Sequence, residues 1–181
     1  MKNYFIIHGT FGHNKENWFP WLETELKNQG GGYEIYNLNY PTPENQSFEN
    51  WSKVLDDYKD KISNESVFIC HSIGCIFLVK YCILNKIKIG KAIFVSGCNN
   101  YFFNPEFDII NKDMYTDRIS EFKDYCDDVI CFYSKDDPYI TLDALKSFAD
   151  KVNAKHIVYK NAGHFNEKAG FKTFTDILKY I

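Results

Sequence analysis

The chain has 181 residues, a formal net charge of -3 at pH 7, and 45% hydrophobic and 18% aromatic residues. This length suits one domain spanning residues 1–181, which would bury about 70% of the surface that its unfolded chain exposes. The mild charge, without a basic cluster, argues against nucleic acid or an anionic membrane as partner. No apolar run approaches the ~20 residues of a membrane span, and the apolar N-terminal run is too short for a signal peptide. We therefore expect a soluble cytoplasmic protein, a monomer or weak homo-oligomer.

Six cysteines occur in the chain, and most of them lie in or beside apolar runs. These are Cys70, Cys75, Cys82, Cys98 and Cys131. In a cytoplasmic chain, buried free thiols are the expected state of such residues. The sequence has no C-x-x-C pair and no Cys/His grouping with zinc-site spacing, so we predict no metal and no cofactor.

The first half of the chain alternates short apolar runs with helical patterns. In order, we expect a strand at Tyr4–His8, a glycine-rich turn, a helix capped by Asn17 and stopped at Gly30, a strand at Tyr33–Leu38, a helix from Ser47 through Tyr58, and a strand at Val67–Cys70. The helices show apolar residues at helical spacing, and Pro20 lies in the first turn of the earlier one.

The second half continues the alternation. We expect a buried helix after Ser72, a strand at Lys91–Ser96, a short helix at Tyr115–Tyr125, a strand at Val129–Tyr133, a helix starting at Thr141 or Asp143, a strand at His156–Tyr159 and a helix at Phe171–Ile181. Strands that alternate with helices predict an α/β protein with a mostly parallel sheet covered on both faces.

Residues 97–128 are longer than one crossover helix requires. One interpretation is a surface excursion whose aromatic side chains pack on the sheet edge. The other is a small lid, because ligand sites in open α/β sheets lie beyond the carboxyl ends of the strands.

The turn from strand to helix at Cys70-His71-Ser72-Ile73-Gly74 is too short for an ordinary loop. Such a turn strains its middle residue and requires small neighbours, as in the nucleophile elbow G-x-S-x-G. The second glycine is present, and Cys70 replaces the first. Taken alone, the pattern also fits a serine that N-caps a buried helix.

Residues that follow strands supply a nucleophile, an acid and a base in the order Ser72, Asp136 or Asp137, and His164. Parallel strands bring their carboxyl ends to one edge, and this order is that of the α/β-hydrolase triad. His164 can take the proton from Ser72, and a carboxylate would orient the imidazole. We prefer Asp137, which precedes Pro138, and interpret Asp136 as a solvated loop charge.

An acyl-transfer site also needs two backbone N–H groups directed at the oxyanion. Ile73 follows the nucleophile at a helix N-terminus, and the Gly9-Thr10 turn is the natural source of a second donor, so we assign the N–H groups of Ile73 and Thr10. Of the remaining histidines, His8 is expected to be a structural partner beneath the site and His71 to point away from it.

Several blocks together are more specific than any single motif. They are H-G-T-F-G at 8–12, W-F-P-W-L at 18–22, Y-P-T-P at 40–43, the H-S-x-G elbow, S-K-D-D-P at 134–138 and G-H-F at 163–165. This set resembles the small serine hydrolases of the retinoblastoma-binding-protein-9/YdeN-like family. The resemblance implies a compact α/β-hydrolase fold, a three-layer α/β/α sandwich with six parallel strands in the order 2-1-3-4-5-6. It also implies a triad of Ser72, Asp137 and His164.

From these residues we predict a serine hydrolase that cleaves small carboxylic esters through an acyl-enzyme, with a small-molecule ester or acyl substrate. Two alternatives remain open at this point. The same triad cleaves amides or peptides, and a hydrolase scaffold can serve as a protein-binding module with little catalysis. The aromatic residues Phe11, Trp18 and 101–103 hint at an apolar acyl or aryl group near the nucleophile.

Overall fold

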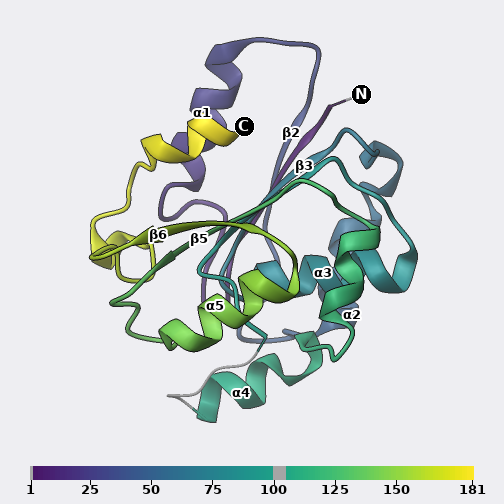
Figure 1. The fold of residues 1–181 in the computed structure, drawn as a ribbon. Helices are drawn as coiled ribbons and strands as arrows, with labels where there is room; N and C mark the ends of the chain where they lie inside the picture. Colours follow the sequence, from purple (N-terminus) through teal and green to yellow (C-terminus); the bar gives the residue numbers. More distant parts are fainter. Residues whose placement is uncertain (1, 100–104) are drawn as a thin grey trace.

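A computed structural model describes residues 2–99 and 105–181. Its centre is a sheet of six strands in the order β2-β1-β3-β4-β5-β6, and every neighbouring pair is parallel (Figure 1). The strands are β1 Tyr4–Ile7, β2 Ile35–Leu38, β3 Val67–His71, β4 Lys91–Val95, β5 Val129–Ser134 and β6 Lys155–Tyr159. The predicted strand order and parallel sheet are confirmed.

Helices cover both faces of this sheet. They are α1 Phe19–Gln29, α2 Phe48–Asp56, α3 Ile73–Asn85, α4 Pro105–Asn111 and α5 Leu142–Lys151, with 3₁₀ turns η1 Lys59–Lys61, η2 Lys112–Met114, η3 Ile119–Asp124, η4 Glu167–Ala169 and η5 Thr175–Tyr180. In Figure 1, α1 and the yellow C-terminal segment lie on one face, and α2, α3 and α5 lie on the other. The molecule is the expected three-layer α/β/α sandwich.

The alternation of side chains along β1 explains why the sheet has two cores. Successive side chains of a strand point to opposite faces. Phe5 and Ile7 accordingly pack in the core beneath α2, α3 and α5, while Tyr4 and Ile6 pack in the core beneath α1. A strand that is apolar at every position is thus the pattern of a sheet buried on both faces.

Two of the three predicted helix caps are observed. The Ser47 side chain accepts a hydrogen bond from the Asn50 N–H, and Thr141 does the same for the Ala144 N–H. The Asn17 cap was a wrong prediction, since Trp18 occupies the cap position of α1. The Asn17 side chain instead accepts a hydrogen bond from the Glu167 N–H at 2.9 Å.

The helices predicted at Tyr115–Tyr125 and Phe171–Ile181 are also corrected, because both segments form short 3₁₀ turns, η3 and η5. The spacing of the buried apolar residues explains why these segments form 3₁₀ rather than α-helices. Ile119 and Phe122 are buried three residues apart, as are Phe174 and Ile177, and a spacing of three places side chains in line on a 3₁₀ helix.

The long segment after β4 has two parts in the described residues. Its later part packs on the sheet through Met114, Ile119 and Phe122, all buried in the core beneath α3. Its earlier part, α4, brings Phe107 to the carboxyl edge of the sheet, where it lines a cavity. Residues 100–104, including the predicted aromatic contacts at 101–103, lie outside the described residues.

Candidate active site

Ser72 forms the whole connection between a strand and a helix, because β3 ends at His71 and α3 begins at Ile73. Its backbone φ of 55° lies in the left-handed region, which non-glycine residues rarely occupy and which is typical of functional turns. Although Ser72 stands at the cap position of α3, its side chain makes no capping hydrogen bond. The helix-cap interpretation of this serine therefore does not hold.

Two glycines allow the close packing that this turn requires. A Cβ on Gly74 would lie 2.6 Å from the carbonyl oxygen of His8, so α3 approaches the end of β1 at backbone contact. A Cβ on Gly9 would lie 2.8 Å from Ser72 Cβ. Cys70, which replaces the first glycine of the elbow pattern, is fully buried in the core beneath α3. The strand thus accommodates a small apolar side chain at that position.

The structure brings Ser72, His164 and Asp137 together from the ends of three different strands. His164 Nε2 lies 3.1 Å from Ser72 Oγ, and His164 Nδ1 lies 2.7 Å from Asp137 Oδ2. Because a carboxylate only accepts, Nδ1–H donates to Asp137, which leaves Nε2 free to accept the serine hydroxyl proton. The Asp137 side chain is fully buried and that of His164 is 8% exposed. The arrangement can move a proton from Ser72 onto His164.

Asp137 is held in this orientation by its own turn. Its second oxygen, Oδ1, accepts hydrogen bonds from the N–H groups of Tyr139 and Ile140 at 2.9 and 3.1 Å. One carboxylate oxygen therefore organises the turn after β5, and the other faces the imidazole. Pro138, which lies between Asp137 and these two donors, has no N–H that would need a partner.

Asp136 corrects a prediction, because it is more than a solvated loop charge. Its Oδ1 accepts hydrogen bonds from Ser134 Oγ and from the N–H groups of Ala162 and Gly163. The hydrogen bond from Ser134, followed by those from the backbone, lowers the pKa of this carboxyl. Asp136 thus fixes the loop that precedes His164, while its neighbour Asp137 contacts His164 directly.

The residues predicted to supply the oxyanion donors lie beside Ser72. Ile73 is the first residue of α3, where backbone N–H groups have no partner within the helix. Thr10 follows Gly9, the residue that contacts Ser72. The turn after β1 and the start of α3 thus lie on either side of the serine.

A polar network holds Thr10 in place. The spacing of its residues along the sequence does not predict this network. Thr10 Oγ1 donates to Asn111 Oδ1 at 2.6 Å, and Gln46 Nε2 donates to both Asn111 Oδ1 and Thr10 Oγ1. Asn111 is fully buried at the end of α4. Because Asn111 lies 101 positions from Thr10 in the chain, only the folded structure shows that α4 contacts this turn.

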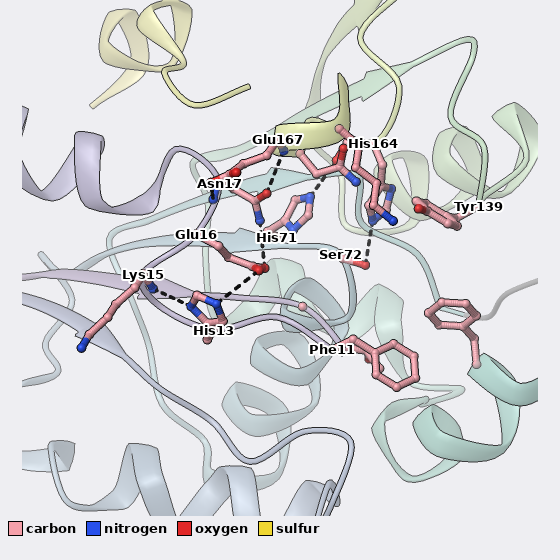
Figure 2. A pocket seen from close by; sticks show the side chains of 15 residues that line it. Phe11, His13, Lys15, Glu16, Asn17, His71, Ser72, Tyr139, His164 and Glu167 are labelled. Atoms are coloured by element: carbon pink, nitrogen blue, oxygen red, sulfur yellow. Dashed lines mark hydrogen bonds and ion pairs between the residues drawn. The ribbon is translucent and has the colours of Figure 1, made fainter. Parts of the chain in front are cut away.

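Ser72 opens into a cavity of about 630 Å³, a size typical of small-molecule sites. Figure 2 shows Phe11 and Tyr139 on one side of Ser72 and His13, Glu16 and Asn17 on the other. Of the aromatic residues predicted near the nucleophile, Phe11 lines this cavity. Trp18 does not, because it is fully buried in the core and its indole N–H donates to the Phe165 carbonyl oxygen.

The serine hydrolase family model matches residues 4–181. The chain belongs to the serine hydrolase family. It is 26% identical over 175 residues to the hydrolase YdeN of Bacillus subtilis strain 168. The aligned residues cover 94% of this chain and 89% of YdeN.

Solved structures share the fold of this chain. The crystal structure of the ydeN gene product from B. subtilis superposes with a TM-score of 0.87 at 25% identity, covering 99% of this chain and 97% of that one. A YdeN-like hydrolase from Pectobacterium atrosepticum gives a TM-score of 0.70 at 16% identity, with 99% and 88% covered. The latter similarity concerns the fold alone.

Two buried histidines adjoin this candidate site, and His71 is among the residues that line its cavity. His8 accepts a hydrogen bond from the Tyr40 N–H at its Nε2, and its Nδ1 lies 2.8 Å from the Gly9 carbonyl oxygen. His71 Nε2 lies 2.8 Å from the carbonyl oxygen of His164, so the residue before Ser72 holds the loop that carries His164. Desolvation by burial lowers the pKa of His8 to about 4 and that of His71 to about 3.

These two histidines predict a loss of stability in mild acid. Both are neutral when folded, but their unfolded pKa is ~6.5, so below that pH the unfolded chain binds more protons. The free energy of unfolding should therefore fall as pH is lowered from about 6.5 towards 4, by up to ~1.4 kcal/mol per pH unit for each histidine. Urea unfolding at several pH values measures this slope. His71→Gln, which keeps a donor near the Nε2 position, should make the slope shallower; an unchanged slope would contradict the assignment to His71.

Within residues 2–99 and 105–181, no helix is long and apolar enough to cross a bilayer. The same residues contain no group of three His, Cys, Asp or Glu side chains placed to hold a metal ion. All six cysteines are buried thiols.

Proposed function

We propose that this serine hydrolase cleaves small carboxylic esters through a covalent acyl-enzyme on Ser72. Ser72 Oγ forms a bond to the carbonyl carbon while its proton passes to His164 Nε2. The tetrahedral intermediate then expels the alcohol, which takes that proton from His164. Water attacks the resulting acyl-enzyme with His164 as base, which releases the acid and restores the Ser72 hydroxyl.

In this reaction Asp137 keeps the His164 proton on Nδ1 and stabilises the imidazolium that forms. The N–H groups of Ile73 and Thr10 hold the negative oxygen of the intermediate. The N-terminal end of α3 adds a partial positive charge beside that oxygen.

The observation that carries the proposal is the chain of two short contacts from the buried Asp137 carboxylate through His164 to a strained, cavity-facing Ser72. Strain at Ser72 lowers stability, and persists only where the surrounding structure enforces it. A scaffold that only bound a partner would gain nothing from a strained serine in hydrogen-bond reach of an imidazole.

Labelling with a fluorophosphonate probe tests the proposal, because only an activated serine reacts rapidly with it. Intact mass spectrometry should show one adduct on the wild-type protein and none on His164→Ala over the same time. Hydrolysis of p-nitrophenyl acetate should be lost in parallel. A folded wild-type protein that forms no adduct would refute the proposal and favour a binding function.

The Asn111 network predicts a second kinetic effect. Asn111 Nδ2 has no hydrogen-bond partner among the described residues, so Asn111→Asp removes no donor in use and retains an oxygen that can accept from Thr10 and Gln46, as Asn111 Oδ1 does. Asn111→Leu removes this acceptor and leaves the Thr10 hydroxyl with the hydrogen bond from Gln46, which loosens the turn that carries the Thr10 N–H. Since small misplacements of catalytic groups cost up to about 100-fold, we expect Asn111→Leu to lower kcat of ester hydrolysis by about 10- to 100-fold with KM nearly unchanged.

The comparison of the two variants separates a positioning role from general loss of structure. Asn111→Asp should recover most of the lost kcat below neutral pH, where a buried carboxyl stays protonated and resembles the amide in shape. Equal kcat in Asn111→Leu and the wild type would show that the turn is held without this network.

A further inference from the structure

Phe11 occupies its position against two local preferences. Its backbone φ is 59°, a conformation that aromatic residues rarely adopt. The residue is also 49% exposed to solvent, although its side chain is large and apolar. A hydrogen bond from the Phe11 N–H to Thr42 Oγ1 at 2.8 Å holds the turn. Glycine would fit this backbone better, so the ring itself is the feature that needs a reason.

The ring belongs to a row of aromatic side chains along one side of the cavity. The centroid of Phe11 lies 5.3 Å from that of Phe107, which lies 6.0 Å from that of Tyr139. Tyr139 in turn lies 5.0 Å from the imidazole of His164, edge to face. We call Phe11, Phe107 and Tyr139 the aromatic wall. All three line the cavity that contains Ser72.

The opposite side of the cavity is polar (Figure 2). Glu16 accepts a hydrogen bond from Asn17 Nδ2 at 3.0 Å and lies 3.7 Å from His13 Nε2. Asn17 also connects this side to the loop after His164, because its N–H donates to the Glu167 carboxylate and its side chain accepts from the Glu167 N–H. We call His13, Glu16 and Asn17 the polar wall.

The positions of the two walls indicate where the acyl part and the alcohol part of an ester would bind. The leaving alcohol must lie within reach of His164. Both walls adjoin His164, since Tyr139 contacts its ring and Glu167, three residues after it, joins the polar wall through Asn17, so the position of each wall relative to Thr10 distinguishes them. Phe11 follows Thr10, the residue assigned to the carbonyl oxygen, so the aromatic wall extends from the acyl side of the scissile bond. Apolar groups are favoured against aromatic surfaces, and hydroxyl groups are favoured where acceptors such as Glu16 are fixed.

We propose that the substrates are esters of an aromatic acid with a small polar alcohol, with the aryl ring of the acyl group on the aromatic wall. This inference rests on the esterase function proposed above and names its substrate class.

Two matched substrate series test the assignment. In the first, the alcohol is ethylene glycol and the acid is acetic, hexanoic or phenylacetic acid. In the second, the acid is phenylacetic and the alcohol is ethylene glycol, butanol or benzyl alcohol. Product analysis by chromatography gives kcat and KM for each ester. The wild type should favour phenylacetyl over acetyl by at least about 30-fold in kcat/KM, mainly through KM, and should favour ethylene glycol in the second series.

Phe11→Gly removes the aromatic ring, and glycine adopts the φ of 59° without strain. The substitution should therefore not prevent folding. It should reduce the preference for phenylacetyl over acetyl to below about 5-fold and leave Tm equal or higher. Phe107→Ala should reduce the preference in the same direction. Lys86→Gly is the matched control, since Lys86 is an exposed residue with φ of 54° at the end of α3, and it should retain the wild-type preference.

The outcomes separate this inference from the esterase proposal. Equal kcat/KM across the acyl series, or an unchanged preference in both Phe11→Gly and Phe107→Ala, would overturn the aryl-acyl site while fluorophosphonate labelling still supported the hydrolase. An aromatic preference that appears in the alcohol series instead would reverse the assignment of the two walls and overturn the inference as stated. Absence of both labelling and turnover would refute the underlying function.

Discussion

Replacing Ser72 by alanine is expected to lower kcat/KM for ester hydrolysis by about five to six orders of magnitude, the scale seen when a triad nucleophile is removed. The acyl-enzyme cannot form without Oγ, because the methyl group of alanine has no atom that can attack the carbonyl carbon. The expected KM is little changed because the aromatic and polar walls remain. Initial rates on a chromogenic ester, with fluorophosphonate labelling by intact mass as a second readout, measure the loss.

Ser72→Gly provides the matched comparison. Both variants lack the nucleophile, but glycine tolerates the φ of 55° at this position, whereas alanine keeps the strain. Ser72→Gly should therefore be more stable than Ser72→Ala by about 1 kcal/mol, with equally low activity. This pattern would show that the strained turn is maintained for function at a cost in stability. Turnover above one per cent of wild type in either purified variant would contradict the assignment of Ser72.

Much of the fold could be predicted because the sheet is buried on both faces. Runs such as Val67–His71 are apolar at nearly every position, and a buried parallel sheet is the structure that such runs form. Parallel pairing then brings every strand end to one edge, so the order of Ser72, Asp137 and His164 in the chain was enough to expect their meeting. The site could be predicted to the extent that it depends on topology.

Contacts between loops could not be predicted, because they depend on where side chains lie after folding. Nothing in the spacing of Thr10, Gln46 and Asn111 connects them, yet they form one network. The same holds for Asn17 and Glu167, which are 150 positions apart. The type of the C-terminal helix was missed for a local reason, since a short segment with apolar residues every third position is compatible with both α and 3₁₀ geometry.

The second large effect concerns the two adjacent aspartates, of which Asp137 contacts His164. Asp137→Asn should lower kcat by about four orders of magnitude, as in other triads that lose the carboxylate charge. The amide can keep the two hydrogen bonds that Oδ1 accepts from the Tyr139 and Ile140 N–H groups. At the Oδ2 position, however, it presents an NH₂ group to His164 Nδ1. The imidazole must then carry its proton on Nε2, where it can no longer accept the proton of Ser72.

Asp136→Asn is the control for this change, because it is the same substitution one residue earlier. Asp136 Oδ1 accepts all three of its hydrogen bonds from Ser134, Ala162 and Gly163, and an amide oxygen can accept the same three. We expect kcat within about 10-fold of wild type for Asp136→Asn, since neutral hydrogen bonds are about half as strong as those to a carboxylate. Single-turnover kinetics on both variants would separate acylation from deacylation. A larger loss in Asp136→Asn than in Asp137→Asn would show that the charge which matters to His164 is the one on the preceding loop, and that the buried contact to Asp137 Oδ2 is structural.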